Sequence, residues 1–245
     1  MKNLEVIVLA AGKGTRLNKG KSSPTAKVLY QIGDKPIIFY LIETLSKLDI
    51  KPLLVVGYKA DEVKKIVGNK AEYVIQEKQL GTADAVNSAK QKLLDSSCSI
   101  MVLCGDMPLL SAKTLKELIN IFQKEKPTIA VLTVEFDDPN KHCFGRILRD
   151  EKGNIASIVE QKNATEEEKQ IKESNSGVYV FDSKWLWQNI DKIKKDPISK
   201  EYYLTDLVEM AIKQNKKVIG IKSQNQKEFL GINTLEQLQR IEEII

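Results

Sequence analysis

The sequence predicts an α/β fold in which a mostly parallel central sheet is covered by helices on both faces. Short apolar runs typical of buried strands alternate with helical patterns through residues 6–134. This order is typical of parallel sheets, because a crossover helix returns the chain before the next parallel strand begins. With 42% hydrophobic residues, the 245-residue chain can bury a sizeable core, so we expect one domain over residues 1–245.

The elements of the first half follow from apolar spacing. We expect strands at residues 6–10, 53–56, 73–75, 100–103 and 129–134. We expect helices at residues 36–48, 61–67, 83–94 and 111–122. Thr82 and Ser111 are residues that cap helix N-termini, and each precedes one of these helices.

The pattern changes after about residue 140. Strand patterns at 146–148 and 155–159 flank DEKGN, where Gly153 and Asn154 suit positive φ, so we expect a β-hairpin that forms a small lobe. Further strands are predicted at 178–181 and 218–221, and helices at 183–193, 203–214 and from 234 onward. Thr165 with Glu168 predicts a capping box. Neither a repeat nor a linker separates this half from the first.

Charge and composition exclude several classes of protein. The chain has 38 Lys or Arg and 33 Asp or Glu, but residues 1–60 carry +6 and the other 185 carry −1. A local anionic ligand is therefore favoured over nucleic acid. No apolar run approaches the ~20 residues of a membrane helix, and no signal peptide is evident, so we expect a cytoplasmic protein without a membrane partner. The chain has three cysteines, an odd number without a CxxC pair, which disfavours a disulfide scaffold. With His142 as the single histidine, a zinc enzyme is also disfavoured.

The segment after the first strand is a candidate phosphate-binding loop. In LAAGKGTR, the small residues Ala10, Ala11, Gly12 and Gly14 allow backbone N–H groups to approach a ligand, and Arg16 adds a cation.

Three other interpretations of this loop remain open. A dinucleotide fingerprint would need a small residue where Leu17 stands. A Walker A loop would need four residues rather than five between Gly14 and Gly20. The third is a glycine-rich turn with solvated lysines.

Motifs along the whole chain carry a resemblance to a known family. After LAAGKGTR come Pro24, KVL at Lys27, QLGTADA at 79–85, CGDMPLL at 104–110, FGRI at 144–147, the stretch 158–181, EYYLTD at 201–206 and GIN at 231–233. In this order they resemble the sugar-phosphate nucleotidylyltransferases, and more narrowly the GlmU-type uridylyltransferase domains. The resemblance implies a Rossmann-like nucleotidyltransferase fold and transfer of UMP from UTP to N-acetylglucosamine 1-phosphate. The products would be pyrophosphate and UDP-N-acetylglucosamine, a cell-envelope precursor.

The resemblance also implies roles for charged residues. Arg16 would contact the β and γ phosphates of UTP, and Lys27 the α-phosphate and the sugar phosphate. Asp106 and Asn233 would hold Mg²⁺, although Asp106 alone could cap a turn and Asn233 a helix. Two residues separate Pro24 from Lys27, where close relatives have none, so Lys21 is an alternative cation.

Other residues are implied in recognition of the base and the sugar. Gln76, Gly81 and Thr82 would contact uracil, although Gln76 could be a solvated strand end and Gly81-Thr82 a helix start. The remaining residues implied near the sugar or the phosphates are Gly105, Gly145, Glu160, Asn175, Tyr203 and Thr205. Cys104 stands where relatives have tyrosine, and we do not expect it to be a nucleophile.

Two rival functions remain open. One is a related transferase that uses another sugar 1-phosphate or nucleotide, such as glucose 1-phosphate or CTP, and the other is a non-catalytic nucleotide-sugar sensor. Bifunctional GlmU-type proteins continue into a left-handed β-helix of hexapeptide repeats. Residues 1–245 contain no such repeats, so we expect no β-helix acetyltransferase domain here.

Overall fold

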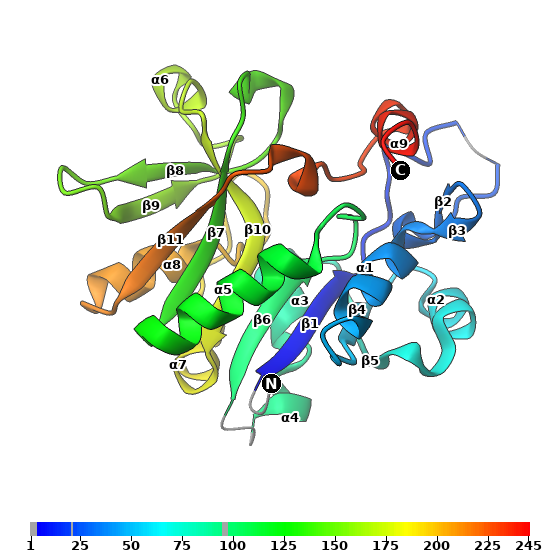
Figure 1. The fold of residues 1–245 in the computed structure, drawn as a ribbon, viewed down its shortest axis with the longest axis horizontal. Coiled ribbons are helices and arrows are strands. Elements are labelled where there is room, and N and C mark those ends of the chain that lie inside the picture. The colour runs from blue at the N-terminus through cyan, green and yellow to red at the C-terminus, as the bar shows by residue number, and fades with distance from the viewer. Residues whose placement is uncertain (1–3, 21, 95–97) are drawn as a thin grey trace.

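A nine-stranded sheet forms the centre of the molecule (Figure 1). The computed structural model describes residues 4–20, 22–94 and 98–245. The main path of the sheet has the order β11-β7-β10-β6-β1-β4-β5. These strands are β1 (Leu4–Ala10), β4 (Leu53–Val56), β5 (Glu72–Ile75), β6 (Ser99–Cys104), β7 (Ile129–Glu135), β10 (Glu173–Asp182) and β11 (Val218–Ser223). All of these pairings are parallel except those of β10, which runs antiparallel to β6 and β7.

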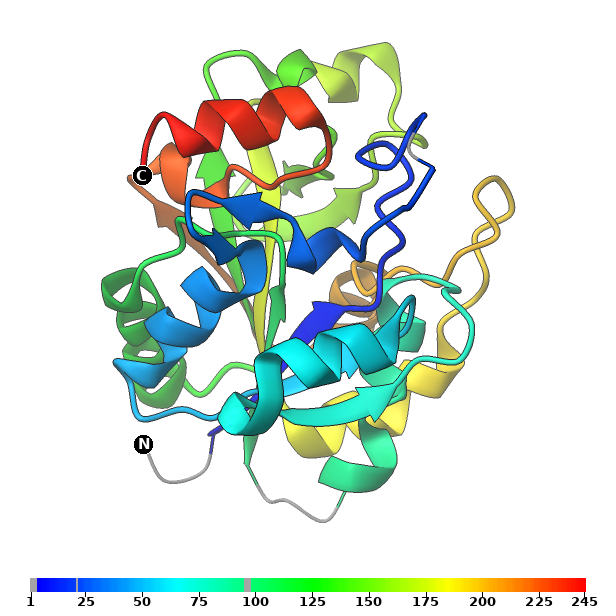
Figure 2. The ribbon, with the colours of Figure 1, turned by 90° about the vertical axis from the view of Figure 1, so that its right-hand side faces the viewer.

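Helices cover both faces of the sheet, which confirms the predicted fold class. Alternate side chains of β1 point to opposite faces, so Val6 and Val8 join one core cluster and Ile7 joins the other. The first cluster includes residues of α1 (Ile37–Ser46), α2 (Ala60–Val67) and α5 (Ala112–Glu125). The second includes residues of α3 (Thr82–Asn87), α4 (Lys90–Leu93), α7 (Ser183–Asn189) and α8 (Asp206–Lys213). Figure 2 shows α1 and α5 on one side of the sheet and α8 on the other.

Three predicted caps and the predicted hairpin are confirmed. Ser111 accepts a hydrogen bond from the Thr114 N–H at the start of α5. Capping boxes begin α6 (Glu166–Lys169), at Thr165, and α9 (Leu235–Glu242), at Thr234. Strands β8 (Arg146–Arg149) and β9 (Ile155–Val159) form an antiparallel pair off the main path of the sheet. In the connecting turn Gly153 has φ +82°, whereas Asn154 does not take positive φ.

Several elements differ from the prediction. The helix expected over 183–193 is α-helical only to Asn189 and continues as a 3₁₀ turn (Ile190–Lys192). The helix expected over 83–94 is divided into α3 and α4, and Thr82 lies inside α3 instead of capping it. The helix expected from 203 begins at Asp206, because the preceding residues run beside the start of α3: the Tyr202 N–H donates to Leu80 O at 2.7 Å. Strand β10 begins five residues earlier than expected and contains a bulge, where Gly177 has φ +79°.

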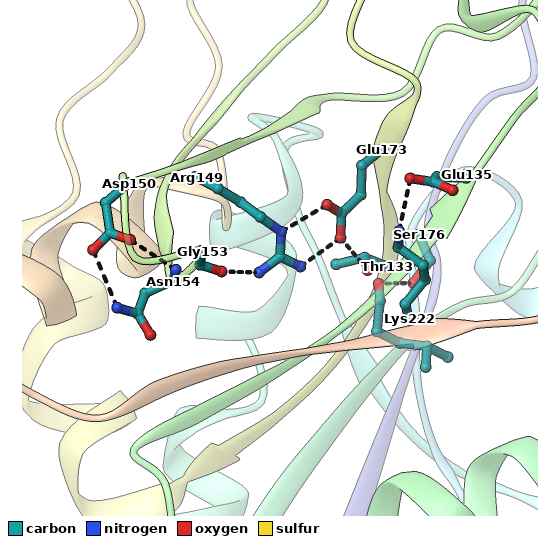
Figure 3. A network of polar contacts seen from close by, with 10 residues as sticks. Thr133, Glu135, Arg149, Asp150, Gly153, Asn154, Glu173, Ser176 and Lys222 are labelled. Carbon is teal, nitrogen blue, oxygen red and sulfur yellow. Dashed lines mark hydrogen bonds and ion pairs between the residues drawn. The ribbon is translucent and has the colours of Figure 1, made fainter.

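An ion pair between Arg149 and a buried carboxylate, Glu173, fixes the hairpin lobe to the sheet (Figure 3). The guanidinium of Arg149, on β8, donates to both carboxylate oxygens of Glu173, at 2.7 and 2.6 Å, and Glu173 also accepts from the Thr133 hydroxyl at 2.6 Å. Glu173 is only 8% exposed. Burial by itself would raise the pKa of the Glu173 carboxyl, but the hydrogen bonds from Arg149 and Thr133 outweigh it and lower that pKa.

A small second sheet connects the N- and C-terminal parts of the chain. Strands β2 (Gln31–Ile32) and β3 (Lys35–Pro36), which the sequence did not predict, pair antiparallel beside α9 (Figure 1). A third apolar cluster lies under them and contains Leu17, Tyr30, Ile32, Ile37, Ile232 and Ile241. The segment after β1 therefore packs against the last helix. Within the described residues, no helix is long and apolar enough to cross a bilayer.

Candidate active site

The candidate site begins where the adjacent parallel strands β1 and β6 end. Leu9 pairs with Cys104 in the register of the two strands. The Gly105 N–H donates to Leu9 O at 2.9 Å, and a Cβ on Gly105 would lie 2.9 Å from that same oxygen. Glycine is therefore needed here for the chain to leave β6 so close to β1. The carboxyl ends of parallel strands are where ligands bind in open α/β sheets, and both candidate loops emerge at this end.

Three predicted site residues from distant segments meet at this end of the sheet. Lys27 begins a 3₁₀ turn (Lys27–Leu29), and its Nζ donates to Asp106 Oδ2 and, at 2.7 Å, to Asn233 Oδ1. The Lys27 and Asp106 side chains are 16% and 15% exposed. The structure thus brings together the cation and both of the oxygen ligands that the family resemblance implied.

The backbone holds Asp106 and Asn233 in place. The Ile232 N–H donates to Asp106 O at 3.1 Å, which fixes the GIN segment against the end of β6. The Asn233 N–H donates to Gln237 Oε1 at 2.7 Å, so Asn233 lies just outside the Thr234 cap of α9. The alternative that Asn233 itself caps this helix is wrong, because Thr234 has that role.

Asn18 organises the long loop between Arg16 and Lys27, and the sequence analysis did not identify it. Its side-chain Nδ2 donates to the carbonyls of Lys13 and Thr25, both at 2.8 Å, and its Oδ1 accepts from the Thr25 N–H at 2.9 Å. An asparagine inside a glycine-rich loop is a common turn residue, and that was the only available signal. The loop is longer than the corresponding loop of the family pattern. These bonds hold it in a shape that places Lys27 beside Asp106.

The small residues of the glycine loop differ in their surroundings. Ala10 and Ala11 are buried, whereas Gly12 is exposed and a Cβ there would meet nothing within 4 Å. Gly14 has φ +61°, and a Cβ on it would lie 3.0 Å from the Cβ of Lys27. Gly14 therefore meets two demands that favour glycine, a left-handed backbone and close contact with the Lys27 stem.

A pocket of about 570 Å³ opens beside Asn233. Arg16, which is exposed, lines it together with Asn233 and Phe144. Lys21, the alternative cation, lies outside the described residues. Arg16 thus shares this pocket with Asn233, and of the predicted cations Arg16 and Lys27, both in the described residues, it is the more exposed.

Arg146 supports the wall of this pocket and was also missed as a functional residue. It is completely buried, and its guanidinium donates to the carbonyls of Pro139 at 2.8 Å, Lys169 at 3.3 Å and Phe144. Burial lowers the pKa of this guanidinium. One side chain thus connects the 139–144 loop to the start of β8. The FGRI motif contained this residue, but sequence alone did not show that it is buried.

Gln76 is buried and oriented, so the alternative that it is a solvated strand end is wrong. It is 3% exposed, and its Nε2 donates to Asp84 Oδ2 at 2.6 Å and to Gly81 O at 3.2 Å. Gly81 has φ +117° and lies against Tyr202. Thr82 is exposed, and its hydroxyl accepts from the Leu204 N–H at 2.9 Å. The uracil candidates therefore form one rigid unit at the start of α3.

The residues predicted to contact the sugar form a second group. The Thr205 hydroxyl donates to Glu160 Oε1 at 2.9 Å. Burial raises the pKa of Glu160, and burial likewise raises the pKa of the nearby Tyr203. Asn175 is buried in the bulge of β10, and its N–H donates to Gly145 O at 2.8 Å. A Cβ on Gly145 would lie 3.1 Å from the Ile158 side chain, so the close packing against β9 favours glycine there.

Cys104 lies at the end of β6, within electrostatic range of charges from both groups. Burial raises the pKa of its thiol to about 12, and the charges of Asp106, Lys27 and Glu160 all act on it. Such a thiol stays protonated at neutral pH, which agrees with the expectation that Cys104 is not a nucleophile.

Comparison with known proteins identifies the protein family to which this chain belongs. Residues 5–227 match the nucleotidyl transferase family, and the chain belongs to that family. It is similar in fold to the solved structure of a putative glucose-1-phosphate thymidylyltransferase from Bacillus anthracis in complex with a sucrose, with a TM-score of 0.75 and 23% identity over 98% of this chain and 94% of the other.

Curated proteins of similar sequence give a more specific comparison than the family does. The chain is 41% identical over 228 residues to the bifunctional protein GlmU of Bacillus licheniformis, covering 93% of this chain and 49% of the relative. It is 38% identical over 240 residues to the bifunctional protein GlmU of Bacillus subtilis, covering 98% and 51%. The chain thus spans about half the length of the curated relatives it matches.

Proposed function

We propose that this protein transfers UMP from UTP to N-acetylglucosamine 1-phosphate, forming UDP-N-acetylglucosamine and pyrophosphate. The observation that carries the proposal is the meeting of Lys27, Asp106 and Asn233 beside the glycine loop. The similarity to bifunctional GlmU proteins supports the choice of substrates. The product would serve the synthesis of the cell envelope.

The proposed reaction needs positioning and charge neutralisation more than proton transfer. A phosphate oxygen of the sugar phosphate forms a bond to the α-phosphorus of UTP, and the bond from that phosphorus to the bridging oxygen of pyrophosphate breaks. The attacking oxygen is already anionic, so no general base is required. Lys27 would neutralise charge near the α-phosphate, and Arg16, at the pocket, would contact the β and γ phosphates. Backbone N–H groups of the glycine loop would orient the same phosphates.

Asp106 and Asn233 suit a divalent metal. Both oxygens already bind one cationic group, the Lys27 ammonium, so they lie close enough to share one cation. A carboxylate and an amide oxygen are hard ligands of the type that Mg²⁺ takes from protein when phosphates and water complete its shell. Bound there, Mg²⁺ would supply Lewis acidity and hold the phosphates in register.

Two rigid groups would select the substrates. Gln76, held by Asp84 and Gly81, would present its amide to the uracil edge. Glu160, held by Thr205, would accept hydrogen bonds from sugar hydroxyls. Asn175 in the β10 bulge would lie against the N-acetyl group. Each of these side chains has a protein partner, which reduces the entropy lost when a ligand is bound.

A substrate panel tests the proposal. Pyrophosphate release is measured for UTP, CTP and dTTP, each with N-acetylglucosamine 1-phosphate and with glucose 1-phosphate, with Mg²⁺ and with EDTA. We expect the highest kcat/KM for UTP with N-acetylglucosamine 1-phosphate, and none with EDTA. A preference for another pair would indicate the related transferase instead. Binding of UDP-N-acetylglucosamine without any turnover would indicate a sensor.

A further inference from the structure

Lys27 occupies the position that the proposed function assigns to a divalent metal. Lys27 Nζ lies between Asp106 Oδ2 and Asn233 Oδ1, which are the two oxygens assigned to the metal. We propose that Lys27 and the divalent metal compete for these two oxygens. In the free protein Lys27 blocks the metal site, and a bound phosphate opens the site by drawing Lys27 away. This inference rests on the proposed metal ligands Asp106 and Asn233.

The backbones that carry the two oxygens are held in place and the side chains of Asp106 and Asn233 are short, so the exchange moves mainly the lysine. Asp106 is held through its carbonyl by the Ile232 N–H at 3.1 Å, and Asn233 through its N–H by Gln237 at 2.7 Å. The lysine side chain, in contrast, has a flexible stem of four carbons. A metal bound to both oxygens would stand beside the ammonium. Because the Lys27 and Asp106 side chains are 84% or more buried, solvent would screen that repulsion poorly.

The glycine loop offers Lys27 another partner. Gly14 lies so close to Lys27 that a Cβ on Gly14 would be 3.0 Å from the Cβ of Lys27. A phosphate bound by the N–H groups of this loop would therefore lie within reach of the Lys27 ammonium. Phosphate is a strong partner for an ammonium group. The lysine would move to the ligand that it is proposed to neutralise and release Asp106 and Asn233 in the same movement.

The consequence is a positive coupling between nucleotide and metal. Metal alone would bind weakly, because it must displace Lys27 from a formed ion pair. Nucleotide would strengthen metal binding, and by linkage metal would strengthen nucleotide binding by the same factor. Removing the lysine charge should therefore tighten binding of the metal in the absence of nucleotide. Removing any nearby cation relieves some repulsion of a metal, but the effect is largest for a cation that occupies the same two oxygens.

Mn²⁺ binding followed by electron paramagnetic resonance tests the competition without turnover. The proteins are the wild-type chain of residues 1–245, Lys27→Met and Lys27→Gln, all without nucleotide and checked for folding by circular dichroism. We expect both neutral variants to bind Mn²⁺ about tenfold more tightly than the wild type, within the range usual for coupled sites. Lys27→Arg keeps the charge and should bind Mn²⁺ as weakly as the wild type. Lys27→Gln preserves the test if Lys27→Met does not fold.

A matched control and a nucleotide arm separate the two proposals. Lys35 forms an ion pair with Glu43 at 2.6 Å, on α1, so Lys35→Met removes a lysine–carboxylate pair elsewhere and should leave Mn²⁺ affinity unchanged. A non-hydrolysable UTP analogue should tighten Mn²⁺ binding to the wild type. If the analogue does so but the neutral Lys27 variants bind Mn²⁺ no better than the wild type, the competition is refuted and the proposed function stands. If no protein binds Mn²⁺ even with the analogue, the metal ligands themselves are wrong.

Discussion

Replacement of Gly81 by alanine should be among the most damaging single-methyl changes in this chain. Gly81 has φ +117° and ψ 179°, a conformation that is essentially restricted to glycine and costs another residue about 1–3 kcal/mol. The added Cβ would lie 2.4 Å from Tyr202 O and 2.6 Å from Tyr202 N. Both are backbone atoms that cannot rotate away. The start of α3 and the segment at Tyr202 must therefore separate.

This separation has a calculable cost. It would break the bonds from the Ala83 N–H to Tyr202 O, at 3.0 Å, and from the Tyr202 N–H to Leu80 O, at 2.7 Å. At about 1 kcal/mol for each bond and about 1–3 kcal/mol for the backbone, Gly81→Ala should destabilise the protein by about 3–5 kcal/mol. For a chain of this size, Tm should fall by roughly 6–20 °C. The KM for UTP should also rise, because Gln76 is bound to Gly81 O.

Gly153→Ala is the matched control. Gly153 also has positive φ, +82°, but a Cβ there would meet nothing within 4 Å. It should therefore cost only about 1–2 kcal/mol, from the backbone alone. Differential scanning calorimetry gives Tm for both variants, and urea titration gives the free energy of unfolding. Equal losses in the two variants would refute the argument, since it depends on the contact with Tyr202 and not on positive φ.

Three further predictions concern the metal ligands, the hairpin lobe and the long loop. Asp106→Ala should lower kcat about 10³-fold, while its circular dichroism spectrum stays that of the wild type. A decrease in kcat of less than about tenfold would remove Asp106 from the mechanism. Arg149→Met should cost about 2 kcal/mol at pH 7, because Glu173 is left buried without its partner while Arg149 is partly exposed. The pKa of Glu173 lies below its usual 4.5, so the stabilisation is complete above that value and is lost as pH falls through the lowered pKa; urea midpoints that differ equally at pH 7 and pH 3 would contradict this. Asn18→Ala should raise the KM for UTP about tenfold, the equivalent of one to two hydrogen bonds, whereas Asn163→Ala, which removes an exposed bond to Asp196, should leave KM unchanged.

The local elements of this fold were predictable because their signals are local. Buried strands such as β4 appear as continuous apolar runs, and the caps at Ser111, Thr165 and Thr234 depend on residues three positions apart. The starts of β10 and α8 were not predictable. The start of β10 depends on pairing with β7 and β8, and the start of α8 on the Tyr202 segment lying beside the start of α3, and these contacts join residues far apart in the sequence.

The same distinction between local and long-range signals applies to the candidate site. The sequence by itself determined which residue types are available, with the glycine loop, the carboxylate at Asp106 and the local excess of positive charge all visible in it. Only the tertiary structure decided that Lys27 lies between Asp106 and Asn233, which are 79 and 206 residues away along the chain. It also decided that Asn18 and Arg146 hold the surrounding loops. The physical reason is that hydrogen bonds and ion pairs depend on distances of about 3 Å in space, and for residues so far apart those distances are set only when strands and helices pack.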